Sequence, residues 1–223
     1  MATTIVFGAD SGVGLEIAKE FGHNKQRIIL VARDQAKLTK ATDDLTMDGI
    51  TTTNYACDAN DFSAIKEMMD DLTKRDRNIE NLVFNVGDKH LDDALSSDTD
   101  LIEKIFKTNV LSAIFTAKEF LSQTDKKAQR SIIFTGGGAA IHPSQKASTL
   151  SLTKAALRSY AYTLHETVKD QNVYVGLVTI QGIIGDSPEM APEKIAPVYW
   201  DLLKKRDDVE ALYPEKISKS EFD

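Results

Sequence analysis

The chain has 223 residues, of which 42% are hydrophobic and 27% are charged, and its formal net charge is −7. This length predicts one globular domain, residues 1–223, and the scattered Lys and Arg residues offer no basic patch for nucleic acid or an anionic membrane surface. The single cysteine, Cys57, excludes an internal disulfide framework. Because the sequence also shows no signal peptide and no run of membrane-spanning length, we expect a cytoplasmic protein.

In the first half of the chain, short apolar runs alternate with segments of helical periodicity. The run at 27–32 (Arg-Ile-Ile-Leu-Val-Ala) is apolar after its first residue, which is typical of a strand buried on both faces. Asp61 stands where its side chain could cap the helix that follows. We expect strands at 4–7, 27–32, 51–57 and 81–85, and helices at 14–21, 36–47 and 62–72.

The second half of the chain repeats this alternation. We expect helices at 101–120 and 148–169, and strands at 131–135 and 173–180. Strands that alternate with helices predict an α/β fold of the Rossmann type, in which a doubly wound parallel sheet carries helices on both faces and so forms three layers.

The end of the chain differs in composition, because four of its five prolines lie between Pro188 and Pro214. Pro192 predicts the first position of a helix that extends to Lys205. No linker sets this segment apart as a second domain. Since open α/β sheets bind ligands at the carboxyl ends of their strands, we expect 183–214 to form a substrate loop, or lid, and the C-terminal segment of the same domain.

A glycine-rich turn joins the first expected strand to the first expected helix and reads Gly-Ala-Asp-Ser-Gly-Val-Gly at 8–14. Glycine permits a tight turn and a close approach to a pyrophosphate, and the helix start offers N–H groups and a positive dipole end. Its spacing differs from the commoner G-x-G-x-x-G, and glycines in another context would indicate only a turn. Between a strand and a helix, the pattern predicts a dinucleotide site at Gly8, Asp10, Ser11, Gly12, Val13 and Gly14.

The end of the second strand indicates which dinucleotide is bound. An acidic residue there favours NAD, whereas a basic residue favours the additional phosphate of NADP. Arg33 comes first after the apolar run, followed by Asp34. We therefore expect NADP(H), with NAD(H) as the less favoured coenzyme. The alternative is an exposed Arg33 beside an Asp34 that caps the next helix.

In its glycine-rich turn and in the motifs that follow, the sequence resembles the short-chain dehydrogenase/reductase family over about residues 5–182. The run Phe-Asn-Val-Gly at 84–87 matches the family's Asn-Asn-Ala-Gly motif with two substitutions. The resemblance implies further coenzyme contacts from Asp58, Ala59, Asn85, Gly87, Lys154, Gly182 and Ile183. It also implies that Asn109 and Lys154 are the Asn and Lys of the family's catalytic tetrad. Two alternatives stay open: a buried Asn109 at a helix kink, and a Lys154 kept only for binding or solvated on its helix.

The sequence departs from the family at the two residues that carry reactive hydroxyls. Counting from Lys154 places Leu150 at the position of the catalytic Tyr, and Gly137 falls at the position of the Ser. In the family the Tyr donates a proton to the substrate oxygen and the Ser hydrogen-bonds it. Losing such a donor commonly costs several kcal/mol of barrier. His142, in the following loop, is a weak candidate for a replacement acid.

Two functions remain open from the sequence. The first is an NADPH-preferring oxidoreductase acting on an unknown small carbonyl or alcohol substrate, with altered or weak catalysis. The alternative is a catalytically inactive NADP(H)-binding sensor or scaffold, since fold alone does not decide function. The resemblance also implies a homodimer or homotetramer formed through 101–120 and 148–169, where small residues recur at helical spacing. The four His residues are too scattered to predict a metal site.

Overall fold

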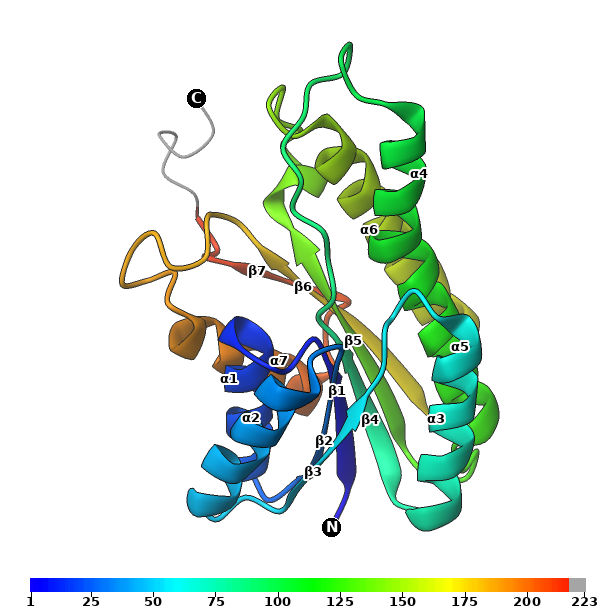
Figure 1. The fold of residues 1–223 in the computed structure, drawn as a ribbon. Coiled ribbons are helices and arrows are strands. Elements are labelled where there is room, and N and C mark those ends of the chain that lie inside the picture. The colour runs from blue at the N-terminus through cyan, green and yellow to red at the C-terminus, as the bar shows by residue number, and fades with distance from the viewer. Residues whose placement is uncertain (217–223) are drawn as a thin grey trace.

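The protein is a seven-stranded parallel sheet with helices on both faces, seen in a computed structural model that describes residues 1–216 (Figure 1). The strand order is β3-β2-β1-β4-β5-β6-β7, and every neighbouring pair is parallel. The strands are β1 (Thr3–Phe7), β2 (Arg27–Ala32), β3 (Thr52–Ala56), β4 (Ile79–Phe84), β5 (Arg130–Gly137), β6 (Val173–Ile180) and β7 (Glu210–Tyr213).

The helices divide between the two faces of the sheet and complete the three layers. They are α1 (Gly12–His23), α2 (Gln35–Met47), α3 (Phe62–Arg75), α4 (Thr99–Phe106), α5 (Ser112–Gln123), α6 (Ser148–Val168) and α7 (Pro192–Lys205). Helices α1, α2 and α7 lie on one face and α3, α5 and α6 on the other, while α4 rises beyond the carboxyl ends of the strands (Figure 1). This arrangement confirms the predicted Rossmann-type α/β fold.

Two hydrophobic clusters, one on each side of the sheet, hold the layers together. The cluster under α3, α5 and α6 includes Phe84 and Phe120. The cluster under α1, α2 and α7 includes Ile17 and Tyr199, whose side chains are fully buried. Strand β6 is buried along its whole length, as its continuous apolar sequence predicted.

Helix starts follow the local sequence closely. The Asp61 side chain accepts a hydrogen bond from the Ala64 amide at 3.0 Å, which confirms the predicted cap of α3. Pro192 occupies the first turn of α7, as expected, and Pro197 lies inside that helix.

The seventh strand was missed by the sequence analysis, which placed all of 183–214 in a lid and C-terminal segment. The structure divides that range into a loop at 183–191, then α7, then β7, which pairs with β6 from Leu177–Glu210 to Ile180–Tyr213. Four residues with a charged Glu210 at their start give little strand signal. The strand forms because Arg158, Tyr162 and Thr179 all donate hydrogen bonds to the Glu210 carboxylate, which an isolated window of sequence cannot show.

The helix expected at 101–120 is wrong as a continuous α-helix. A π-helical turn at Lys107–Leu111, labelled η1, separates α4 from α5. The hydroxyl of Thr108 donates to the Lys104 carbonyl, and that of Ser112 donates to the Thr108 carbonyl, so side chains satisfy part of the loosened turn.

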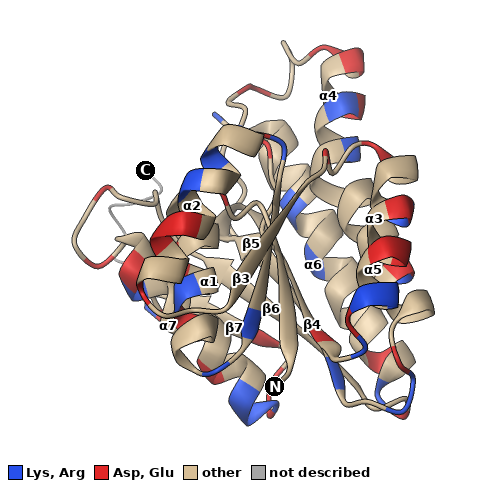
Figure 2. Cartoon of the chain, turned by 60° about the horizontal axis from the view of Figure 1, so that its bottom comes forward, with Lys and Arg blue, Asp and Glu red and all other residues tan. Residues whose placement is uncertain are grey.

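Charges are spread over the helices rather than gathered by sign. In the view of Figure 2, α2, α3 and α5 each carry both basic and acidic residues. No helix within residues 1–216 is long and apolar enough to span a membrane. The same residues contain no group of three or more His, Cys, Asp or Glu side chains placed to hold a metal ion.

Candidate active site

The predicted site residues converge at the carboxyl ends of β1, β4 and β5. Strand β1 lies between β2 and β4, so the chain leaves it towards one edge of the sheet and returns on its other side. Open α/β sheets bind ligands at such a switch in strand order. The ends of these strands and the loops that follow them contain the glycine turn, the 84–87 motif and Gly137.

Glycine is required at two positions of the first turn because the backbone passes too close for a side chain. Gly8 has φ +75°, and a Cβ there would lie 2.8 Å from the Asn85 carbonyl oxygen. A Cβ on Gly14 would lie 1.9 Å from the Gly8 carbonyl oxygen. The turn is therefore pressed against the end of β4 on one side and the first turn of α1 on the other.

The start of α1 has no side-chain cap. Ser11 is the N-cap residue with extended backbone, yet its hydroxyl donates to Asp10 at 3.2 Å instead of accepting from the helix. Gly12 and Ser11 are exposed, whereas Val13 is buried against the sheet. The first N–H groups of α1 thus lack a protein acceptor among their own neighbours, which suits an anionic ligand.

Arg33 and Asp34 take different roles at the end of β2. Asp34 caps α2, with its carboxylate accepting from the amides of Ala36 and Lys37. Arg33 is exposed, and within residues 1–216 its side chain makes no hydrogen bond or ion pair. The alternative of an exposed Arg33 beside an Asp34 that caps the next helix therefore describes the structure. It is compatible with a role of Arg33 towards NADP(H), because the Arg33 guanidinium is unpaired.

The loop after β3 is fixed to the π-helical turn. The Asp58 carboxylate accepts from the Asn60 amide at 2.9 Å, and Ala59 is buried beside it. The Asn60 side-chain amide donates to the Thr108 hydroxyl at 3.1 Å. The predicted coenzyme residues Asp58 and Ala59 are thus held in place through Asn60, which was not predicted from the sequence.

Asn85 joins the glycine turn to β5. Its Nδ2 donates to the Gly8 carbonyl at 3.3 Å, and its Oδ1 accepts from the Thr135 hydroxyl at 2.9 Å. The Thr135 hydroxyl also lies 2.8 Å from the hydroxyl of Tyr199, in α7. Sequence reasoning selected Asn85 but missed Thr135 and Tyr199. The available signal was a tyrosine on the apolar face of an amphipathic helix, since a buried tyrosine hydroxyl needs a partner.

Asn109 is buried and uses its amide on the protein itself. Its Oδ1 accepts from the Asp88 amide at 2.6 Å, and its Nδ2 donates to the Asp88 carbonyl at 3.0 Å and to the Thr153 hydroxyl at 2.9 Å. It therefore ties the loop after β4 to α6. Asn109 lies within the π-helical turn η1, so the alternative of a buried Asn109 at a helix kink describes its surroundings.

Lys154 is buried at the centre of the converging strand ends. Its Nζ donates to the Thr135 carbonyl at 2.9 Å and lies 3.5 Å from the place that a Cβ on Gly87 would occupy. Burial, together with the smaller effect of the positive charge of Lys89, lowers the pKa of Lys154 to about 8. The reading of Lys154 as a solvated helix lysine is therefore wrong.

Leu150 and Gly137, which stand where the family has its Tyr and Ser, offer no hydroxyl beside the Lys154 ammonium. Leu150 is half-buried and lies one helical turn before Lys154, on the same side of α6. A Cβ on Gly137 would lie 3.5–3.6 Å from the Lys154 methylene carbons, in ordinary contact, and the Gly137 backbone is extended with φ −160°. A serine at this position would therefore fit without strain. The nearby hydroxyls of Ser151 and Thr153 donate to carbonyls of their own helix.

The remaining predicted residues lie at the rim. His142 is exposed in the loop after a 3-10 turn at Gly138–Ala140, labelled η2, and its amide donates to the Gly138 carbonyl at 2.8 Å. Ile183 is 73% exposed, while Met190 packs over Gly182. The Tyr213 hydroxyl donates to the Glu189 carbonyl, so β7 anchors the loop at 183–191.

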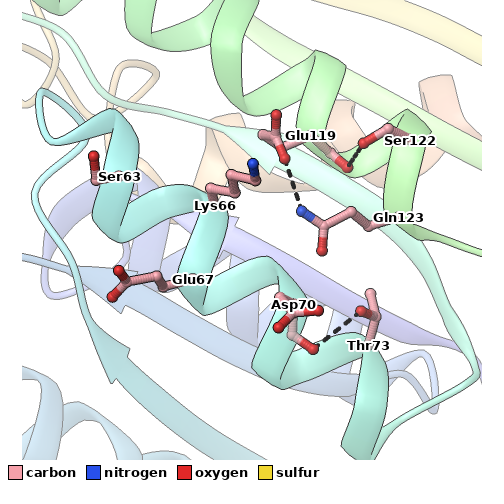
Figure 3. Close-up of a pocket in the computed structure, with 8 residues that line it drawn as sticks. All are labelled: Ser63, Lys66, Glu67, Asp70, Thr73, Glu119, Ser122 and Gln123. Atoms are coloured by element: carbon pink, nitrogen blue, oxygen red, sulfur yellow. Dashed lines mark hydrogen bonds between the residues drawn. The ribbon is translucent and has the colours of Figure 1, made fainter.

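A surface depression of about 790 Å³ lies elsewhere. It opens between α3 and α5 and is lined by Ser63, Lys66, Glu67, Asp70, Thr73, Glu119, Ser122 and Gln123 (Figure 3). Its polar side chains bond one another, as Gln123 does with Glu119 at 2.7 Å. None of the predicted coenzyme residues lines it, and the convergence of groups at the strand ends remains the better candidate for chemistry.

Sequence comparison identifies the family to which this geometry belongs. Residues 2–193 match the sequence model of the short chain dehydrogenase family. The chain belongs to this family. Solved structures that share its fold include complexes with NADPH and with NAD, which are findings about those proteins.

Individual relatives agree with this assignment. The chain is 29% identical to a very-long-chain 3-oxoacyl-CoA reductase of Neurospora crassa over 78% of its own length and 54% of the relative. It is 28% identical to an NADPH-dependent 1-acyldihydroxyacetone phosphate reductase of Saccharomyces cerevisiae, over 87% of its length and 65% of the relative. The chain thus spans only about half to two thirds of these proteins.

Solved structures share the fold. An alcohol dehydrogenase of the archaeon Thermococcus sibiricus, complexed with 5-hydroxy-NADP, superposes with a TM-score of 0.86 at 18% identity, covering 98% of this chain and all of that one. At this identity the likeness establishes the architecture alone.

Proposed function

We propose that this protein is an NADPH-preferring oxidoreductase for a small carbonyl or alcohol substrate, with slow turnover because Leu150 and Gly137 stand where the reacting hydroxyls are expected. The observation that carries the proposal is the placement of Lys154, whose ammonium is anchored on the Thr135 carbonyl beside Gly87. That position can hold a nicotinamide ribose even when no tyrosine lies next to it.

The protein's own residues divide the work of the reaction. When bound, a reduced nicotinamide supplies hydride to a carbonyl carbon. The uncapped start of α1 binds phosphate, Arg33 attracts an additional phosphate, and Asn109 fixes the loop over the site. Lys154 holds the ribose hydroxyls and keeps a positive charge near the forming alkoxide. No side chain at Leu150 or Gly137 can donate the proton, so it comes from water or from His142.

NADPH is favoured over NADH by the exposed and unpaired guanidinium of Arg33. The yeast relative is named as NADPH-dependent, which supports the same preference. The substrate panel should include 3-oxoacyl thioesters besides simple aldehydes and ketones, since the Neurospora relative is named as an acyl-CoA reductase.

A four-protein comparison tests the proposal. NADPH oxidation is measured for the wild type, Leu150→Tyr, Leu150→Tyr with Gly137→Ser, and Asp43→Tyr, which adds the same ring at an exposed position of α2. We expect slow turnover in the wild type and in the control variant. Both Leu150→Tyr variants should turn over about 10²-fold faster or more, because a missing oxyanion donor costs a factor of this size. Absence of NADPH binding by calorimetry would overturn the proposal.

The alternative function, an inactive NADP(H)-binding sensor or scaffold, is favoured by the same two missing hydroxyls. It predicts micromolar NADPH binding with no wild-type turnover on any substrate of the panel. Rescue of turnover by the double variant would then show a degenerate site that retains its coenzyme. Wild-type turnover itself distinguishes the two functions. If turnover occurs, a His142→Ala variant distinguishes the two proton sources, because it abolishes turnover only if His142, and not water, supplies the proton.

We also propose a homodimer or homotetramer through 101–120, which spans most of α4, η1 and most of α5, and through 148–169, which contains α6. Large apolar side chains are exposed there at Leu111, Leu152 and Tyr162. Apolar surface that gathers on helices commonly marks a protein interface. Light scattering of the wild type and of Leu152→Glu tests this: the charged variant should dissociate, and a monomeric wild type would contradict the proposal.

A further inference from the structure

A chain of hydrogen bonds crosses from the C-terminal helix to the glycine turn, and its direction can be deduced. Asn85 Nδ2 donates to the Gly8 carbonyl, which turns Asn85 Oδ1 towards Thr135. The single hydroxyl hydrogen of Thr135 is used on this Oδ1. The Tyr199 hydroxyl must therefore donate to Thr135 Oγ1, at 2.8 Å. Every link runs one way, from α7 through β5 and β4 to the turn.

Deep burial makes each link depend on its neighbour. Tyr199 is 0% exposed and Thr135 is 8% exposed, so water cannot easily replace either partner. Burial raises the pKa of Tyr199 above its ordinary value, and its hydroxyl keeps its proton and remains a donor. Helix α7 packs directly on α1, the helix whose start faces the turn.

The chain ends at the tightest contact of the site. The Gly8 carbonyl that accepts from Asn85 is the atom against which Gly14 is pressed, and a Cβ on Gly14 would also lie 2.9 Å from Asn85 Nδ2. A shift of the Asn85 amide would therefore move the first turn of α1. Thr135 contributes a second connection, since its carbonyl accepts from Lys154 Nζ.

We propose that Tyr199 is a positioning residue for the coenzyme site: its buried hydroxyl orients Thr135, which holds the glycine turn through Asn85 and holds Lys154 through its own carbonyl, in the geometry that binds the dinucleotide. This rests on the proposed function in requiring that the turn binds NADP(H). A helix in the C-terminal part of the chain thus sets coenzyme affinity without touching the coenzyme.

The main test compares two buried tyrosines that each donate one hydrogen bond. Tyr199→Phe removes the first link. Tyr174→Phe is the matched control, because Tyr174 is 6% exposed and its hydroxyl donates at 2.7 Å to the Asp208 carbonyl, away from the turn. Both variants should show a similar fall in melting temperature. Only Tyr199→Phe should raise the Kd for NADPH, by about 5- to 20-fold in calorimetry, with the control within twofold.

Variants of the middle link separate positioning from general stability. Thr135→Val keeps the shape and removes the hydroxyl, and should raise the Kd at least as much as Tyr199→Phe. Thr135→Ser keeps the hydroxyl and should restore the Kd to within about threefold of wild type. The double variant Tyr199→Phe with Thr135→Val should bind no worse than Thr135→Val alone, because both changes break one chain.

The outcomes are distinguishable. Wild-type protein that binds no NADPH refutes the proposed function before the hydrogen-bond chain is tested. If wild type binds and Tyr199→Phe loses melting temperature but keeps its Kd within twofold, Tyr199 is only structural and the inference is overturned. Should Tyr199→Phe fail to fold, equal Kd values for Thr135→Val and Thr135→Ser would overturn it instead.

Discussion

The two ends of the sheet carry matching rows of polar residues with different partners. Near the amino ends of the strands the row is Thr4, Asn81 and Ser131. Four residues further along the chain it is Gly8 and Asn85, which directly follow β1 and β4, and Thr135 within β5. Because side chains alternate along a strand, residues four apart face the same side of the sheet. In both rows an Asn after or within β4 lies between a group on β1 and a hydroxyl on β5.

The rows differ in where their hydrogen bonds end. In the row near the amino ends of the strands, the lower row, Ser131 donates to Asn81 at 2.6 Å, and Asn81 donates to Thr4 and to Gln26. The hydrogen bonds of the lower row therefore end on side chains, and the row of Gly8, Asn85 and Thr135 is the upper row. The upper row ends instead on main-chain atoms of the glycine turn and extends to Tyr199 and Lys154. The same arrangement therefore stabilises the sheet at one end and shapes a binding site at the other.

The largest expected effect comes from filling a glycine at each end. Gly8→Ala and Gly49→Ala place a Cβ at φ +75° and +80°, but only at Gly8 does that atom meet backbone, 2.8 Å from the Asn85 oxygen. We expect Gly49→Ala to cost about 1 kcal/mol and Gly8→Ala several kcal/mol. Gly8→Ala should also lower NADPH affinity at least tenfold. Urea unfolding and calorimetry measure both quantities, and equal losses at the two sites would contradict the close packing of the turn.

The buried cation of the upper end should appear in the pH dependence of stability. The pKa of Lys154 is about 8 in the folded protein and near 10.5 when unfolded. Between these values the unfolded chain binds more protons, so the free energy of unfolding should rise with pH from about 8 to 10.5, by on the order of 2–3 kcal/mol. Lys154→Met should lack this rise. Parallel curves for the two proteins, from urea unfolding at pH 7 to 10, would contradict the burial of the ammonium.

The two ends of β2 carry arginines that offer a comparison of coenzyme selectivity. Arg33 is unpaired at the carboxyl end, while Arg27 pairs with Asp76 at 3.2 Å at the amino end. Arg33→Ala should raise the Kd for NADPH about 10- to 30-fold, which is about 1.4–2 kcal/mol, with little change for NADH. Arg27→Ala should leave both values unchanged. Equal weakening for the two coenzymes would show that Arg33 does not contact the additional phosphate.

The smallest expected effect lies in the lower row. Ser131→Ala removes the 2.6 Å hydrogen bond to Asn81 and should cost about 1–2 kcal/mol of stability, because a buried amide oxygen loses its donor. NADPH affinity should not change. A change in affinity would mean that the two rows are coupled through their shared strands, and the comparison above would need revision.

Much of the fold could be predicted from the sequence, because most strands can be recognised from a short stretch of neighbouring residues. The apolar runs at 27–32 and 173–180 and the capped helix after Asp61 each need only a few neighbouring residues to be recognised. The glycine turn could also be predicted, since the strand before it and the helix after it are both visible. The parallel order then follows from the alternation of strands and helices.

The features that were missed depend on contacts between distant residues. Glu210 is buried in β7 only because Arg158, 52 residues earlier, reaches its carboxylate. Tyr199 and Thr135 are 64 residues apart in sequence, so no local pattern links them. The π-helical turn likewise depends on what Asn109 bonds outside its own helix.

That turn at Lys107–Leu111 has a consequence for insertions and deletions in the family of related sequences. A π-helical turn holds about one residue more than an α-helical turn, and one residue rotates a helix by about 100°. Deleting a single residue here would let α4 and α5 join as one regular helix, but would swing the buried Ile105 of α4 out of its position. We therefore expect chain length between α4 and α5 to be invariant among proteins that keep an asparagine bonded to the loop after β4.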